Sequence, residues 1–150
     1  MRRSSIGIFL ALVLAAGCAT AGPQWVTFPD GGSGKGTTLE VWLKKHPLAA
    51  GQEIRLDEIS RGDSSSAHIV QVRKEEPLHI HQNHDAVVVI LRGRGILTLA
   101  KRRLEVKPGA ILSIPRGVPH SFLNQGPDPA IAFAVFLPAF DGKDRILVKE

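Results

Sequence analysis

The feature that most limits what this chain can fold into is the spacing of its apolar residues between positions 53 and 137. They recur with a period near two in short segments, and Gly, Pro, Asp or Asn separates most of these segments. Such alternation indicates a β-strand with one buried face, and turn residues at its ends indicate a chain reversal. The predicted strands are residues 53–59, 67–74, 86–92, 95–99, 102–106, 110–114, 120–124 and 130–137.

No long helical crossover separates these segments. The one helix-like piece after Gly36 spans residues 38–45 and ends at His46 and Pro47. About eight short strands without crossovers predict an all-β fold, a closed antiparallel barrel or jelly roll that hides its edges. A length of 150 residues suits one domain with one core, and no repeat or second domain is visible.

The first residues are typical of an export signal. Arg2 and Arg3 precede an apolar run at residues 6–16, and Gly17 and Cys18 follow it. This run is shorter than the roughly 20 apolar residues of a transmembrane helix, so removal after export is the better interpretation. Cys18 is the single cysteine, which excludes an internal disulfide.

The stretch Leu14-Ala15-Ala16-Gly17-Cys18 resembles the lipobox of bacterial lipoproteins. The resemblance implies that residues 1–17 are a signal peptide and that Cys18 carries the lipid. The alternative is an ordinary secretory signal cut after Ala21, which gives a soluble periplasmic or secreted protein.

Ala19, directly after the cysteine, is similar to the pattern of lipoproteins in the outer membrane of Gram-negative cells. The resemblance implies a cell-envelope protein that faces the periplasm and touches the membrane through its lipid anchor alone. Residues 19–36 are Gly-rich and Pro-containing, which predicts a flexible tether, with residues 37–150 forming the barrel. The apolar residues 25–28 offer an alternative, an edge strand added to that barrel.

The charge balance argues against nucleic acid as a partner. The formal charge of +5 includes Arg2 and Arg3, so the chain without its signal carries +3. The one dense basic run, residues 101–103, falls where a hairpin turn is expected. A small molecule of unknown identity, and a second copy of the chain, remain the candidate partners.

Three histidines have the spacing of a metal site. His79 and His81 lie two residues apart, so in a strand their side chains share one face. His120 follows a turn at residues 115–119, whose prolines and glycine fix the backbone that enters the next strand. The three imidazoles are therefore candidate ligands of one ion.

The sequence resembles the cupin superfamily, which carries two motifs, G-x5-H-x-H-x3,4-E-x6-G and G-x5-P-x-G-x2-H-x3-N. The second motif is complete here. Its five fixed residues are Gly109, Pro115, Gly117, His120 and Asn124. The resemblance covers roughly residues 50–150 and implies the cupin double-stranded β-helix, a jelly-roll barrel.

The first cupin motif is only partly present. His79, His81 and Gly93 match it, but Arg73 replaces its opening glycine and Ala86 replaces its glutamate. This departure leaves the negative ligand of the family unaccounted for.

The resemblance implies that His79, His81 and His120 bind a divalent transition metal, Fe, Mn, Ni, Cu or Zn. Asp85 also has an allowed spacing from His81 and is a candidate replacement for the glutamate. If Ala86 faces inward, however, its neighbour Asp85 faces outward unless a bulge intervenes. Because ligand histidines must be neutral, the metal is expected to dissociate near pH 6.5.

Two classes of function stay open. The first is a metal-dependent enzyme, an oxygenase or isomerase of unknown substrate, because three histidines leave coordination positions for a reactant. The second is a module that binds a small molecule or a metal without turnover, and the missing glutamate favours it. A purely structural barrel with vestigial histidines is a further alternative.

Overall fold

A computed structural model describes residues 24–25 and 37–148, and two short strands and one helix precede the main body. These are β1 (Gln24–Trp25), β2 (Thr37–Thr38) and α1 (Leu39–Lys45). Nine further strands follow in chain order: β3 (Ile54–Arg61), β4 (Ser66–Val72), β5 (Glu75–His81), β6 (Asp85–Arg92), β7 (Gly95–Leu99), β8 (Arg102–Val106), β9 (Ile111–Ile114), β10 (His120–Asn124) and β11 (Ala130–Leu137). A last strand, β12 (Arg145–Leu147), follows.

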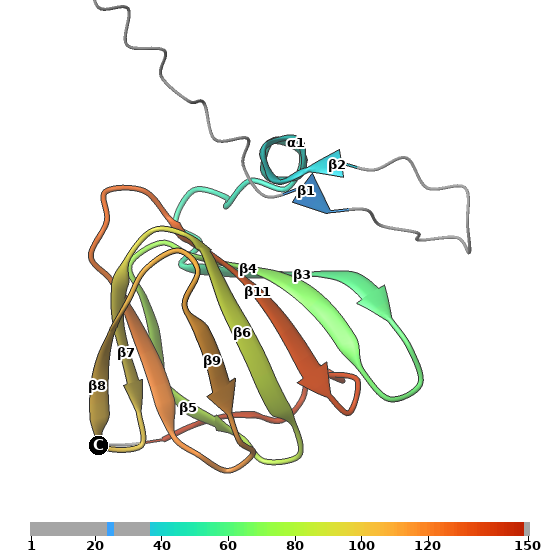
Figure 1. Cartoon of the computed structure of the whole chain (residues 1–150), viewed down its shortest axis with the longest axis vertical. Helices are drawn as coiled ribbons and strands as arrows, with labels where there is room; N and C mark the ends of the chain where they lie inside the picture. The colour runs from blue at the N-terminus through green and yellow to red at the C-terminus, as the bar shows by residue number, and fades with distance from the viewer. Residues whose placement is uncertain (1–23, 26–36, 149–150) are drawn as a thin grey trace, which may run out of the picture.

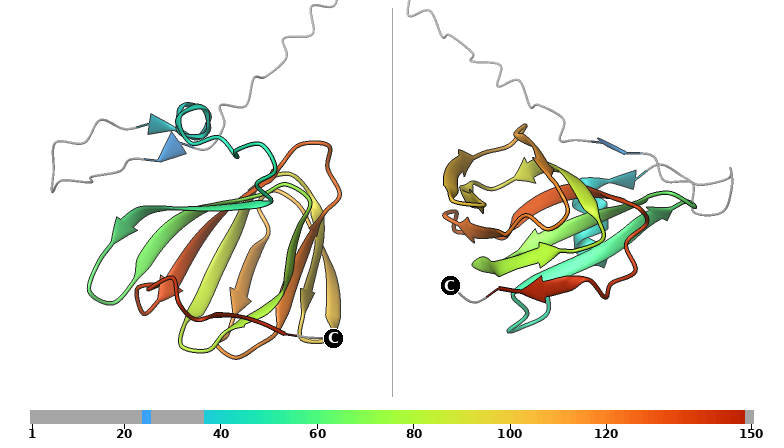
Figure 2. Two further views of the ribbon diagram at one scale, coloured as in Figure 1. Left: turned by 180° about the vertical axis from the view of Figure 1, so that it is seen from behind. Right: turned by 90° about the horizontal axis from the view of Figure 1, so that it is seen from below.

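Ten strands form two antiparallel five-stranded sheets. One sheet has the order β3-β4-β11-β6-β9 and the other β12-β5-β10-β7-β8. Figure 1 shows the strands of both sheets around a common interior, and the second panel of Figure 2 shows them from below. The arrangement is a single-domain double-stranded β-helix, which confirms the all-β jelly-roll prediction.

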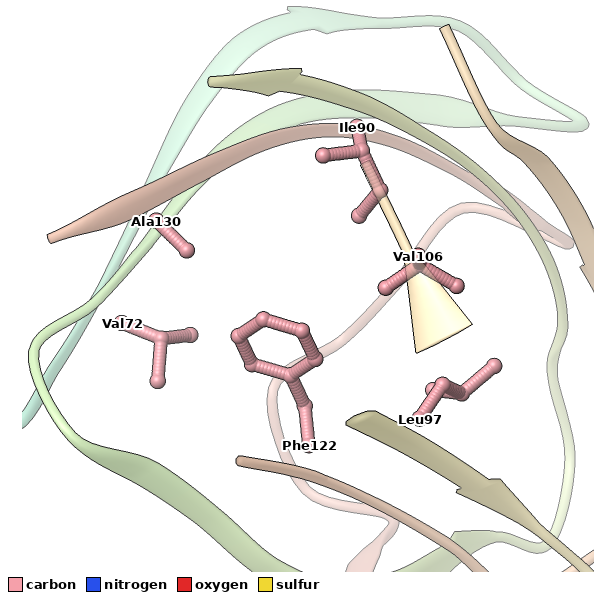
Figure 3. Close-up of a cluster of buried hydrophobic side chains, with 6 residues drawn as sticks. All are labelled: Val72, Ile90, Leu97, Val106, Phe122 and Ala130. Carbon is pink, nitrogen blue, oxygen red and sulfur yellow. The ribbon is translucent and has the colours of Figure 1, made fainter. Parts of the chain in front are cut away.

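The barrel interior is filled by side chains from both sheets. Its largest cluster surrounds the ring of Phe122, as Figure 3 shows. The other members of this cluster are Val72, Ile90, Leu97, Val106 and Ala130. Removing such side chains from water supplies the main stabilisation of a fold of this kind.

Helix α1 packs on the outside of the first sheet. Thr38 caps its first turn, since the side chain accepts a hydrogen bond from the Val41 N–H at 3.3 Å. Leu39 is fully buried against Ile69 of β4 and Ile131 of β11. Within the residues described, no helix is long and apolar enough to span a membrane.

Two glycines lie where a side chain would collide with the fold. Gly93 has a φ of +81°, and an added Cβ would lie 2.9 Å from Cα of Ala130. At Gly95 a Cβ would meet the ring of Phe122 at 2.5 Å and the carbonyl oxygen of Leu123. Gly117 also has a positive φ, +75°, which confirms the predicted turn before β10.

The predicted strands agree with the structure, and four of them have the observed bounds: β7, β8, β10 and β11. Strands β5 and β12 were absent from the prediction. Of the apolar residues 25–28, the structure describes Trp25 alone, and this residue pairs with β2 rather than with a strand of either barrel sheet. The predicted signal peptide, Cys18 and all of the tether except residues 24–25 lie outside the described residues.

Candidate metal centre

The three candidate histidines meet inside the barrel, on adjacent strands of the second sheet. His79 and His81 extend from β5, and His120 of β10 is the register partner of His79. All three are buried, and one ligand atom from each lies within 4.8 Å of the others. The ring centroids are 4.1 Å apart for His79 and His120 and 5.0 Å apart for His79 and His81.

Hydrogen bonds orient each of these rings through its Nδ1 atom. Nδ1 of His79 donates to the Pro77 carbonyl at 2.8 Å, and Nδ1 of His120 donates to the Val118 carbonyl at 3.0 Å. Nδ1 of His81 lies 3.3 Å from Oδ1 of Asp144. This pattern leaves Nε2 of each ring as the nitrogen that could bind a metal.

The electrostatic setting keeps the imidazoles neutral, as metal ligands must be. Burial, followed by the nearby His120, lowers the pKa of His79 to about 3. Burial also lowers the pKa of His120 to about 4. Burial lowers the pKa of His81 as well, against the opposing effect of Asp144.

The donor set fits a divalent transition ion. Nε2 of His79 is buried and has no hydrogen-bond partner among the described residues. A buried polar atom of this kind is costly unless a ligand satisfies it. Three neutral imidazoles suit Zn, Cu, Fe and Ni better than a hard ion such as Mn²⁺.

The structure does not bring Asp85 to the three histidines. Its carboxylate is partly exposed and accepts hydrogen bonds from Arg116, from the backbone N–H at 2.8 Å and from Nη2 at 2.6 Å. These contacts lower the pKa of Asp85 to about 2. Ala86 is buried in the interior, so the strand alternation points Asp85 to the other face.

An unexpected carboxylate lies inside the barrel instead. Oε1 of Glu76 is 3.5 Å from Nε2 of His79. The pairing of β5 with β10 is irregular here, because His79 faces His120 but Glu76 faces Phe122. One extra residue in β5 therefore forms a bulge around Pro77, and the bulge turns Glu76 to the side of His79.

Asp144 links the histidine group to the loop after β5. Besides His81, its carboxylate accepts hydrogen bonds from Nδ1 of His84 at 2.6 Å and from the Asn83 N–H at 2.8 Å. His84, Asp141 and Asp144 form a second group with ligand atoms within 4.8 Å. Both ring nitrogens of His84 face acceptors, however, the second being the Ala139 carbonyl at 3.3 Å.

The other histidines and the motif asparagine lie away from the three-histidine group. His46 stacks on Trp42, with ring centroids 4.2 Å apart. His68 is buried, and its Nε2 lies 2.8 Å from the hydroxyl of Ser66. Asn124 shapes a turn, since its side chain donates to the carbonyls of Arg73 and Asp128.

A cavity of about 130 Å³ adjoins the histidines. His81 and His120 line it together with Glu76 and Arg145, and the rest of its wall is apolar. An engineered apolar cavity of roughly 150 Å³ binds benzene, so this space suits a small molecule. Glu76 and Arg145 escaped the sequence analysis, although a proline within a strand, as at Pro77, is a known sign of a bulge.

Comparison with known proteins gives a consistent result at the level of the domain. The model of the cupin domain matches residues 67–136, which include all three histidines. An uncharacterised protein of Aquifex aeolicus is 30% identical over 107 residues, which cover 71% of this chain and 88% of that protein. An uncharacterised protein of Methanocaldococcus jannaschii is 34% identical over 81 residues, which cover 54% of this chain and 65% of that protein.

Solved structures share the fold at low sequence identity. A Klebsiella pneumoniae protein with a double-stranded β-helix domain has a TM-score of 0.60 and 18% identity, covering 72% of this chain and 95% of that chain. KdgF from Halomonas has a TM-score of 0.57 and 19% identity, covering 62% and 86%. A nucleoside dehydratase has a TM-score of 0.53 and 15% identity, covering 64% and 82%. Since the cupin-domain model matches residues 67–136 and the barrel has the double-stranded β-helix fold, the chain contains a cupin domain.

Proposed function

We propose that this cupin holds one divalent transition metal on His79, His81 and His120 and uses it to transform a small molecule bound in the barrel. The observation that carries the proposal is the common orientation of the three rings. Each Nδ1 has an acceptor, and the buried Nε2 of His79 has no protein hydrogen-bond partner among the described residues. A metal ion supplies the missing partner and, when bound, polarises an oxygen atom of the substrate.

Glu76 supports an enzyme rather than a passive metal site. It is the one carboxyl group among the described residues that line the cavity. Burial raises the pKa of Glu76, against the opposing charge of Arg145. A carboxyl group in this setting can hold a proton or accept one from a substrate, so we assign Glu76 the role of general acid or base.

Metal analysis of protein purified without a histidine tag tests the metal site. We expect about one ion per chain after loading with Fe, Ni, Cu or Zn. His79→Ala and His120→Ala should each lose most of that metal, whereas His46→Ala should keep it. Stoichiometric metal in both His79→Ala and His120→Ala would refute the proposed site.

A screen of the loaded protein tests turnover, using oxygen uptake with small phenols and thiols and solvent deuterium exchange with small carbonyl compounds. The assigned role would be supported if the Glu76→Gln variant keeps its metal but no longer catalyses a reaction that the wild type catalyses. A loaded protein without any turnover would favour the second candidate.

That second candidate is a module that binds a metal and a small molecule without turnover. The observation in its favour is that Ala86 occupies the position where the cupin motif has its glutamate ligand. The similarity to a nucleoside dehydratase does not make a nucleoside the expected ligand, because a nucleoside is larger than the benzene-sized space of this cavity.

We also propose that the protein works in the cell envelope of a bacterium as a lipoprotein of the outer membrane, anchored through Cys18. The support is the lipobox-like stretch before this cysteine and Ala19 after it. The anchor leaves the barrel facing the periplasm.

A further inference from the structure

A cation with one unsatisfied nitrogen lies in the wall of the cavity. Arg145 of β12 lines the cavity, and its Nη2 atom is buried without a hydrogen-bond partner among the described residues. An N–H of a charged group that is buried without an acceptor costs more free energy than an unpaired N–H of a neutral group. Such an atom suggests a ligand that supplies the missing acceptor.

Arg145 lies at the same end of the cavity as the histidines. It is the register partner of His81 in the pairing of β12 with β5. Its Nε atom lies 3.8 Å from Oε1 of Glu76, which in turn lies 3.5 Å from Nε2 of His79. The polar groups of the cavity are therefore gathered at one end.

The remainder of the cavity wall is hydrocarbon. Residues of both sheets contribute to it, among them Val70, Val88, Leu97, Leu112, Phe122 and Ala132. A ligand that fills the cavity must therefore be polar at one end and apolar at the other.

We infer that the ligand is a small apolar carboxylic acid, with Nη2 of Arg145 donating a hydrogen bond to its carboxylate and its hydrocarbon part lying against the apolar wall. This inference rests on the proposed function, since it names the substrate class of the same cavity. The charges agree with it. Arg145 and a divalent ion together outweigh Glu76, so the polar end attracts an anion.

Ligand-observed NMR with isobutyrate tests the inference, and isobutyramide is the matched neutral probe of the same shape. Both are titrated into the zinc-loaded and the metal-free protein, with zinc content measured on the same samples. We expect at least tenfold tighter binding of isobutyrate than of isobutyramide, because a hydrogen bond to a charged group is worth about 1.5–3 kcal/mol.

In the metal-free protein, where no ion attracts the carboxylate, Arg145→Gln should remove this preference, and the same variant should still take up zinc. Arg103→Gln on the exposed strand β8 is the control for loss of one positive charge. Should Arg145→Gln fail to fold, Arg145→Lys replaces it. The lysine variant should then prefer isobutyrate over isobutyramide less strongly than the wild type does. Equal binding of the two probes to the metal-free wild type, or an unchanged preference in metal-free Arg145→Gln, would overturn the inference even if the protein binds zinc. If the protein binds no metal but still prefers isobutyrate in a way that depends on Arg145, the inference about the ligand stands. The proposed metal site is then refuted.

Discussion

Oδ1 of Asp144 lies 3.3 Å from Nδ1 of His81, although 63 positions separate the two residues in the chain. Neither residue is exposed, and the carboxylate also accepts a hydrogen bond from His84. A carboxylate that accepts from the outer nitrogen of a ligand histidine fixes its ring and makes its inner nitrogen more basic. In the proposed metal site, Asp144 would therefore be a positioning residue.

Asp144→Asn should weaken metal binding by roughly tenfold or more, because the neutral amide polarises His81 less than the carboxylate does. Competition with a chromogenic chelator measures the change. Asp141→Asn, in the same loop but exposed, is the control, and an equal effect of both substitutions would remove the special role of Asp144.

Asp85→Asn should leave the metal content unchanged, since the Asp85 carboxylate is held by Arg116 and Ala86 faces the interior. Metal analysis of the purified variant checks this. A large loss of metal would mean that Asp85 has replaced the family's glutamate after all.

Acid should destabilise the metal-free protein through His79. Its pKa in the fold is about 3, below the 6.5 of an unfolded histidine. Between these values the unfolded chain binds more protons, so the contribution of His79 to stability is present above pH 6.5 and is lost towards pH 3. At pH 5 this loss is about 2 kcal/mol for one histidine.

Urea unfolding of the wild type and of His79→Gln, at about pH 7.5 and about pH 5, isolates this term from the other titrating groups. On going from about pH 7.5 to about pH 5, the wild type should lose about 2 kcal/mol more unfolding free energy than the variant loses. A difference independent of pH would contradict it. From the lowered pKa values of His79 and His120, we expect metal release at a pH below the 6.5 that the sequence alone predicts.

Gly95→Ala should lower the free energy of unfolding by about 3 kcal/mol, because the new Cβ collides with the Phe122 ring and with backbone. Gly62→Ala is the matched control, since the nearest atom to its Cβ is the Ser65 carbonyl oxygen at 3.8 Å. Denaturant unfolding measures both, and similar stability of the two variants would show that the barrel adjusts freely at β7.

Cys18→Ser should abolish lipid attachment and release the exported domain from the membrane, since Cys18 is the single acyl acceptor of the lipobox-like stretch. Labelling with a radioactive fatty acid and fractionation of a bacterial host check it. A serine variant that still carries lipid would refute the lipoprotein assignment.

The sequence was most informative where local chemistry decides the structure. Strand β10 has its predicted bounds because Pro119 precedes it, and the spacing of the histidines predicts their shared location. Glu76 escaped prediction because the bulge at Pro77 shifts the alternation by one residue. Asp144 and Arg145 escaped because their positions depend on the pairing of β12 with β5, a contact between distant segments that periodicity does not encode.

The pairing of β12 with β5 also sets an order of events during synthesis. The residues that would orient and charge the proposed metal site lie between residue 76 and residue 145, and β12 is the last strand among them. A ribosome-bound chain that has not yet released β12 lacks both the carboxylate behind His81 and the guanidinium in the cavity wall. The complete pocket therefore forms only after translation has passed residue 145, and a shorter nascent chain would offer the proposed metal an incomplete site.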